Sequence, residues 1–496
     1  MIDIQLTYQL YHQWQTEKNI SILGSAFIAD KLLQNETLIH YFHNCNSEQI
    51  FIERLDKLSG HFAIIIELED KILASVDLIR TYPIFFRHRE QNIIITDRII
   101  AQQDDEYNAI EIENFKKVYN ALENNTLLKN WQQLLAGQYL VVDKKNQTVS
   151  IKTYYHHAKE TANITDTELL NKLSSLEEKL VKNLIEYANN RTILVPLSGG
   201  YDSRYILALL KQSNYEKIEC FTYGRKNSYE VLIAKNVAEK LNIKWHFIEY
   251  TDTLLDTFFS KDWQQYSNAN HHFSSLPHEQ DFFALHYMKQ HQLLPKNAVV
   301  INGYCQDIHA GSFIEPIKNF SLQKVINYKY DIQLNTYDYE NSWNGYQEWL
   351  AKNRLSKFII NSVRVFEYFG IDFYLPFWNR DWIDFCYSLS MEKRLNQKFF
   401  NQHLFSGIFK QYHIDFKKPS HDETNSFYTL KKVVKSILPQ KITEQIRKQN
   451  SVNPQNDVNN SLYLYERIYE KLNQKPIAKD FKINNIHALY FLQNLK

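Results

Sequence analysis

"VPLSGGYDSR", residues 195–204, is the stretch that decides the fold of the second part of this chain. The chain has only 11 Gly in 496 residues, yet Gly199 and Gly200 stand side by side here. The apolar run "RTILVPL" leads into them, and the helical pattern "DSRYILALLKQ" begins two residues after them. Glycines at a strand-to-helix turn let the backbone approach an anion, because no Cβ atom is in the way. The stretch therefore predicts a phosphate-binding loop.

Three polar side chains add chemistry to this loop. Ser198 and Ser203 would supply hydroxyl donors at its two ends. Asp202 would repel phosphates unless a cation lay between them, so it predicts Mg²⁺. Neither GxxxxGK[ST] nor GxGxxG occurs, which excludes the Walker and dinucleotide-binding forms. The alternative is that Asp202 only caps the following helix and Ser198 only fills a tight turn.

The surrounding pattern predicts a doubly wound parallel α/β domain. An amphipathic helix begins at Thr165 and Asp166, which are helix-capping residue types. After the loop, strand patterns at 217–224 and 244–250 flank a helix pattern at 228–241. The remainder of the chain is mostly helical in pattern.

The first part of the chain predicts an antiparallel α+β domain that ends near residue 160. Strand pairs are expected at 60–78, 82–98 and 137–155, with a helix at 112–125. We therefore expect three parts: residues 1–160, 161–420 and a helical extension, 421–496.

Composition excludes several function classes. The net charge of +1 gives no basic surface for nucleic acid, and the most basic stretch, 431–448, is typical of a solvated helix face. No run approaches the ~18 apolar residues of a membrane span, and the N-terminus does not resemble a signal peptide. The four cysteines form no CxxC pair. We expect a cytoplasmic protein without membrane insertion or a nucleic-acid partner, and leave its oligomeric state open.

"LSGGYDSR" resembles the PP-loop of the N-type ATP pyrophosphatases, and its context is similar to asparagine synthetase-like proteins. In "INGYCQDIHAGS" (301–312), Gly303, Asp307 and Gly311 match that family's second acidic motif. The resemblance implies that Asp202 and Asp307 hold Mg²⁺ and that Lys398 steadies the pyrophosphate. It further implies ATP contacts at the residues of both motifs and of one strand end: Leu197, Ser198, Gly199, Gly200, Asp202, Ser203, Tyr223 and Gly303.

The resemblance extends to the first part, where 60–86 is similar to hairpins of class II glutamine amidotransferases. That family uses an N-terminal Cys, whereas this chain reads Met-Ile-Asp and has its first cysteine at Cys45. We therefore expect a degenerate amidotransferase-like domain without glutaminase activity. Ile308 also departs from the family, which has Glu after the Mg²⁺-binding Asp.

The function implied is an ATP-dependent, AMP-forming carbon–nitrogen ligase. It would adenylate a carboxylate and transfer the acyl group to ammonia or an amine. Homologues of this kind amidate sugar acids of bacterial surface polysaccharides or close peptide macrolactams. The alternative is a catalytically degenerate nucleotide-binding or scaffold protein, which Ile308 and the missing cysteine favour. A tRNA-modifying PP-loop enzyme is disfavoured by the net charge and the isolated cysteines.

Other polar residues carry weaker predictions. His271, His272 and His278 are expected in a polar loop that lines the substrate cleft rather than in a metal site. His309 is a candidate contact to substrate or pyrophosphate, with a turn-filling role as the alternative. Glu367 is a candidate base, and a structurally paired carboxylate is the alternative.

Overall fold

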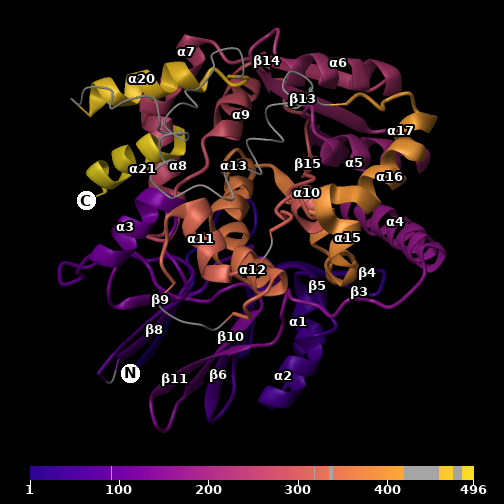
Figure 1. The fold of residues 1–496 in the computed structure, drawn as a ribbon. Helices are drawn as coiled ribbons and strands as arrows, with labels where there is room; N and C mark the ends of the chain where they lie inside the picture. Colours follow the sequence, from indigo (N-terminus) through magenta and orange to yellow (C-terminus); the bar gives the residue numbers. More distant parts are fainter. Residues whose placement is uncertain (91, 318, 335–338, 418–456, 473–482, 496) are drawn as a thin grey trace.

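The computed structural model describes residues 1–90, 92–317, 319–334, 339–417, 457–472 and 483–495. In Figure 1, the N-terminal strands lie at the bottom, the parallel sheet at the upper right and the C-terminal helices at the upper left. Within the described residues, no helix combines the length and the apolar character that crossing a membrane would require.

The N-terminal part contains two sheets. The four-stranded sheet has the order β1-β8-β7-β9, with β1 parallel to β8 and the other pairs antiparallel. The larger antiparallel sheet has the order β11-β10-β6-β5-β3-β2, and β4 pairs with β3. The helices of the N-terminal part are α1 (Glu36–Phe42), α2 (Glu48–Leu55) and α3 (Ala109–Val118). The strands are β1 (Ile2–Gln5), β2 (Gln15–Glu17), β3 (Ile20–Ile28), β4 (Lys31–Gln34), β5 (Ser59–Glu67), β6 (Lys71–Val76), β7 (Phe85–Arg89), β8 (Asn92–Thr96), β9 (Trp131–Gln133), β10 (Gln138–Asp143) and β11 (Thr148–Thr153).

The near-continuous apolar run of β5 has a packing reason. Phe62 and Ile64 belong to the core cluster formed with α1 and α2, while Ala63 and Ile65 belong to the cluster that includes Ile93 of β8. Both faces of this strand are therefore buried, and alternation of polar and apolar residues is lost. The three expected strand pairs are confirmed. The helix expected over 112–125 is wrong at its end, because α3 stops at Val118 and Tyr119 has a left-handed backbone (φ 68°).

The second part is built on a parallel sheet of order β14-β13-β12-β15-β16. Every neighbouring pair in it is parallel, as the sequence predicts. From β12 the chain adds β13 and then β14 on one side of the sheet. It then returns and adds β15 and β16 on the other side of β12, so the order of the strands reverses between β12 and β15 while all strands stay parallel. Ligands of such sheets bind beyond the carboxyl ends of the strands at this reversal. The strands are β12 (Thr192–Pro196), β13 (Ile218–Gly224), β14 (Lys244–Glu249), β15 (Ala298–Ile301) and β16 (Asp372–Tyr374).

Helices connect and cover this sheet. Thr165 caps α4 in a reciprocal bond pattern with Glu168, which confirms the predicted helix start. The π-helical segment Ala351–Ile359 continues α12. The helices are α4 (Asp166–Ala188), α5 (Tyr201–Gln212), α6 (Tyr229–Leu241), α7 (Asp252–Leu255), α8 (Lys261–Asn270), α9 (Gln280–Gln290), α10 (Gln306–Ala310), α11 (Leu322–Tyr330), α12 (Trp343–Leu350), α13 (Val363–Tyr368), α14 (Arg380–Ser388), α15 (Met391–Arg394), α16 (Lys398–Ser406), α17 (Ile408–Gln411), α20 (Ser461–Lys471) and α21 (Ile483–Asn494).

The expected domain division stays a prediction. The boundary near residue 160 falls in the segment between β11, which ends at Thr153, and α4, which begins at Asp166. Much of the extension 421–496, including the basic stretch 431–448, lies outside the described residues.

Candidate functional site

The loop "LSGGYDS" begins at the carboxyl end of β12 and is fixed there by the neighbouring strand. The Leu197 amide donates a hydrogen bond to the Phe221 carbonyl across 2.8 Å. The Thr222 hydroxyl donates to the Leu197 carbonyl across 2.6 Å, and the Trp245 indole donates to that hydroxyl across 2.9 Å. These contacts set where the loop leaves the sheet.

The two serines bind within the loop itself. The Gly200 amide donates to Ser198 Oγ across 3.0 Å, and the Ser198 amide donates to Ser203 Oγ across 3.2 Å. Gly200 is the N-cap residue of α5 and has no side chain to cap it, so the helix begins with backbone amides. A Cβ atom at Gly199 would lie 3.0 Å from Cα of Glu230, so a side chain here would crowd the start of α6. The loop is compact and ends at a helix N-terminus.

The structure brings the two acidic motifs together. The Asp307 amide donates a hydrogen bond to Asp202 Oδ2 across 3.2 Å. Gly303 packs on Asp202 so closely that a Cβ atom there would lie 3.0 Å from the Asp202 Cβ. Cys305 lies between Gly303 and Asp307 in the sequence and has a left-handed backbone (φ 71°), which turns the chain into α10.

These residues line one cavity of about 350 Å³ at the carboxyl ends of the central strands. Ser198, Asp202, Ser203, Gly303, Asp307, Leu197 and Tyr223 are all among its lining residues. Gly199 and Gly200 shape the loop but are not part of the lining. The remaining lining residues, which the sequence analysis did not assign to the site, are Pro196, Phe221, Thr222, Glu230, Gln280, Asp281, Asn302, Tyr304, Cys305, Val458 and Asn459.

A buried polar network forms one wall of the cavity. Asp281 accepts hydrogen bonds from the Tyr304 hydroxyl at 2.6 Å and shares one with His278 Nε2 at 3.0 Å. Burial raises the pKa of Asp281, but the bonds from His278 and Tyr304 outweigh it and lower that pKa below its usual value. Burial lowers the pKa of His278, and the bond to Asp281 more than reverses this and raises it. Tyr223 stacks on Tyr250 at 4.8 Å between ring centroids.

This network could be found in the sequence only in part. His278 and Asp281 are spaced i, i+3 in "HEQD", which brings side chains together near the start of a helix. Tyr304 stands within the second acidic motif, but nothing local links it to Asp281. Their contact joins the segment after β15 to the start of α9, so it depends on how these two elements pack in the folded chain.

A C-terminal segment closes one edge of the cavity. Val458 and Asn459 belong to its lining, and the Arg225 amide donates to the Val458 carbonyl across 2.7 Å. A Cβ atom at Gly224 would lie 2.5 Å from that carbonyl oxygen, so glycine permits the approach. The Asn460 side-chain amide donates to the Tyr250 carbonyl across 3.2 Å. Residues expected only to form a helical extension thus reach the site.

Lys398 is not brought to this cavity. It begins α16, its side chain is 61% exposed, and its amine pairs with Glu392 Oε1 at 2.9 Å. Glu392 raises the pKa of Lys398 by this contact. The backbone of Asn396 and Gln397 has positive φ just before it and sets where the helix starts. Its role in pyrophosphate binding stays a prediction.

His271, His272 and Glu367 lie in the interior of the protein and do not line the cavity. His271 and His272 are buried, and burial lowers the pKa of His271 to about 4. Only His278 reaches the site, through Asp281. Glu367 forms a buried ion pair with Arg364 at 2.6 Å, which is the paired carboxylate given as the alternative.

His309 also lies away from the cavity. Its Nδ1 atom lies 2.8 Å from the Tyr387 hydroxyl, and its ring packs edge-on against Trp378. Burial holds its pKa well below the usual value, so it stays neutral. Ile308, beside it, is half-buried against the core. His309 is thus an interior residue that does not line the cavity, whereas a contact to substrate or pyrophosphate was the expectation.

This part of the protein belongs to the class of doubly wound α/β structures. Its glycine-serine loop lies where the order of the strands reverses. Within it, residues 187–263 match the asparagine synthase family. The matched segment covers the end of α4, the loop and β13, but not Asp307 or Lys398. No curated protein matches the chain.

Solved structures with weak similarity to this chain include two synthetases and an amidotransferase. NH3-dependent NAD synthetase from Campylobacter jejuni is 17% identical over 31% of this chain and 72% of its own, with a TM-score of 0.20. NMN synthetase from Francisella tularensis is 14% identical over 52% and 100%, with a TM-score of 0.22. Glutamine PRPP amidotransferase from B. subtilis is 10% identical over 48% and 72%, with a TM-score of 0.19. At these TM-scores the similarity establishes neither fold nor function.

Proposed function

We propose that this protein is an ATP-dependent ligase that forms an amide or related carbon–nitrogen bond and releases AMP and pyrophosphate. The asparagine synthase match over 187–263 supports use of ATP in a ligase reaction. The observation that carries the proposal is the Asp202–Asp307 contact at the cavity, because it joins two motifs far apart in the chain.

The acidic pair fits Mg²⁺. Asp202 and Asp307 offer carboxylate oxygens, the ligand type that Mg²⁺ prefers, and both face the same cavity as the loop. The absence of a Cβ atom at Gly303 keeps the second motif in contact with Asp202. Bound there, Mg²⁺ would neutralise charge on the phosphates.

The chain's own groups have distinct tasks. Backbone amides at the start of α5, with Ser198 and Ser203, bind phosphate oxygens, because a helix N-terminus carries positive partial charge. Leu197 and Tyr223 line the side of the cavity at β13, where we place the nucleoside. Tyr304, held by Asp281, is positioned to orient the second substrate.

The proposed reaction has two steps. An oxygen of the substrate carboxylate attacks the α-phosphorus, the bond from that phosphorus to the bridging oxygen breaks, and pyrophosphate leaves. The nitrogen of ammonia or an amine then attacks the acyl carbon, AMP leaves, and the nitrogen gives up one proton to solvent or a basic group. The carboxylate is a small molecule or a peptide, with sugar acids and macrolactam precursors as the two candidates.

We further propose that ammonia or the amine comes from outside the protein. All four cysteines are buried: Cys45, Cys220, Cys305 and Cys386. Burial raises the pKa of the Cys45 thiol and raises that of Cys220 to about 12. A glutaminase needs a reactive, accessible thiolate, and these thiols are protonated and enclosed.

A second candidate is a nucleotide-binding protein without catalysis. Two observations favour it: Ile308 stands where the family has Glu, and Lys398 lies outside the cavity lining. ATP binding alone is expected of both candidates, so a binding test would not separate them.

The test is pyrophosphate exchange into ATP with candidate carboxylates, followed by analysis of the nucleotide product. A ligase gives carboxylate-dependent exchange and AMP, and Asp202→Ala abolishes both. Formation of ADP would contradict the AMP-forming assignment. ATP binding without exchange across sugar-acid and peptide panels would favour the non-catalytic candidate.

A further inference from the structure

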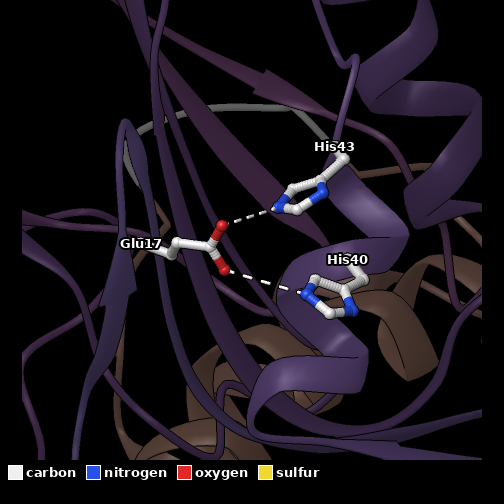
Figure 2. A group of neighbouring side chains, drawn as sticks. All are labelled: Glu17, His40 and His43. Atoms are coloured by element: carbon white, nitrogen blue, oxygen red, sulfur yellow. Dashed lines mark ion pairs between the residues drawn. The ribbon is translucent and has the colours of Figure 1, made fainter.

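Three potential metal ligands gather at the edge of the large N-terminal sheet (Figure 2). Glu17 is the last residue of β2, the edge strand of that sheet. His40 lies in the last turn of α1, and His43 follows directly after the helix. Figure 2 shows both imidazole rings turned toward the Glu17 carboxylate.

The spacing of these atoms is too long for direct hydrogen bonds. His43 Nε2 lies 3.4 Å from Glu17 Oε1, and His40 Nε2 lies 3.8 Å from Glu17 Oε2. An N–H···O bond is normally about 2.7–3.2 Å long. His43 Nε2 is shielded from solvent and makes no hydrogen bond to any described residue. A shielded imidazole nitrogen without a hydrogen bond is uncommon and calls for a partner.

The same spacing suits a bridging ion. Two ligands on a tetrahedral Zn²⁺ with bonds of about 2.0–2.2 Å lie roughly 3.3–3.5 Å apart. The three ligand atoms lie within 4.8 Å of one another, so small side-chain rotations bring them onto one ion. Two imidazoles with one carboxylate favour Zn²⁺ and related transition metals over Mg²⁺ or Ca²⁺, which prefer oxygen ligands.

We propose that Glu17, His40 and His43 bind Zn²⁺, with the fourth position open to water. The backbone around the ligands is already fixed: Arg54 of α2 donates to the His43 carbonyl across 2.7 Å. Across the hairpin, the hydroxyls of Thr16 and Ser21 lie 2.9 Å apart.

The ion would tie the sheet edge to a helix. Within the described sheet, β2 has β3 as its one neighbouring strand, so its other edge is unpaired. A metal bound between β2 and α1 would hold this strand in place. None of the three ligands lines the nucleotide cavity, so the site is separate from the proposed ligase chemistry.

The test uses untagged full-length protein, stripped with EDTA and titrated with Zn²⁺ in excess Mg²⁺. Mg²⁺ keeps the oxygen ligands of the nucleotide cavity occupied. We expect one equivalent of Zn²⁺ by calorimetry and a higher melting temperature, because the ion binds only the folded chain. Glu17→Gln and His43→Ala should each weaken binding by about tenfold or more. His88→Ala is the matched control, since His88 is an exposed histidine on β7 of the same part.

Three outcomes would overturn the proposal. They are no stoichiometric Zn²⁺ binding by the wild type, binding by Glu17→Gln and His43→Ala as tight as by His88→Ala, and loss of the ion in Asp202→Ala. If His43→Ala does not fold, Glu17→Gln carries the test, because it keeps the side-chain shape. The readout is binding and melting, so failure of the ligase assignment would leave it unaffected.

Discussion

Asp307 donates its backbone amide to the Asp202 carboxylate across 3.2 Å, although the two residues are 105 positions apart in the chain. The contact joins α5, the helix after β12, to α10, the helix after β15. These two strands are neighbours, and the order of the strands in the sheet reverses between them. It places both carboxylates at one cavity with the loop. The proposed chemistry depends on this juxtaposition.

Asp202→Asn should reduce pyrophosphate exchange by roughly a hundredfold or more, because the neutral amide removes charge that would hold the metal against the phosphates. Melting temperature should change little, since Asn keeps the acceptor for the Asp307 amide. Asp70→Asn, in the turn between β5 and β6, is the exposed control. Equal exchange by both variants would remove Asp202 from the site.

Gly303→Ala should lower the affinity for ATP and Mg²⁺ and destabilise the fold by about 1–3 kcal/mol through overpacking. The new Cβ atom would meet the Asp202 backbone and Cβ at 3.0 Å. Gly370→Ala is a control for backbone strain, because Gly370 has φ +78° but no atom within 4 Å of a built Cβ. Nucleotide titration and denaturant unfolding of both variants make the comparison. A loss of ATP affinity in Gly370→Ala as large as in Gly303→Ala would argue against a specific effect at Asp202.

The pair of His278 and Asp281 should give stability a pH dependence with two sides. The raised pKa of His278 contributes stability that is present below the unfolded value of about 6.5 and is lost as the pH rises through the folded pKa. The lowered pKa of Asp281 contributes stability that is present above the unfolded value of about 3.9 and is lost as the pH falls through the folded pKa. The pair therefore stabilises most between these two unfolded values.

His278→Asn should flatten the fall in stability above about pH 6.5, measured by urea unfolding between pH 5.5 and 8.5. Asp281→Asn should cost about 3–5 kcal/mol near pH 6, because it leaves buried His278 without its counter-charge. The exposed His88→Asn should keep the wild-type profile. An unchanged profile in His278→Asn would show that this pair does not titrate as described.

Lys398→Ala should keep exchange within roughly threefold of wild type, because the amine lies on the surface against Glu392 and such exposed pairs contribute little. Asp202→Ala, measured alongside, defines full loss. A hundredfold loss in Lys398→Ala would support the predicted role of Lys398 in pyrophosphate binding and require α16 to move toward the cavity on binding.

Asn460→Ala should raise the KM for ATP with little change in kcat, since it loosens the segment that carries Val458 and Asn459. The variant removes hydrogen bonds to the Tyr250 carbonyl and to Asp252. Steady-state kinetics over a range of ATP concentrations measures this. Asn494→Ala, on the exposed end of α21, is a suitable control. A fall in kcat at unchanged KM would contradict a role at the edge of the nucleotide site.

Local sequence predicted most of the elements but fewer of the contacts. The strand pairs, the start of α4 and the parallel sheet follow from periodicity and capping residues, which act over a few positions. The sequence does not predict that α3 ends at Val118, because Tyr119 has a left-handed backbone conformation that is uncommon for tyrosine. Glu367 and His309 look reactive in sequence, yet packing encloses both, one in an ion pair with Arg364 and the other against Trp378.

The sequence by itself determined that a glycine-serine loop with Asp202 lies between a buried strand and a helix, because turn geometry and backbone access are local properties. The tertiary structure alone decided that Asp281, Tyr304 and Asn459 share a cavity with that loop and with Asp307, which the family resemblance had paired with Asp202, while Lys398 does not line it. It also decided that Glu17 meets His40 and His43. Such contacts depend on which strands and helices become neighbours, and that follows from burial of the whole core rather than from any single motif.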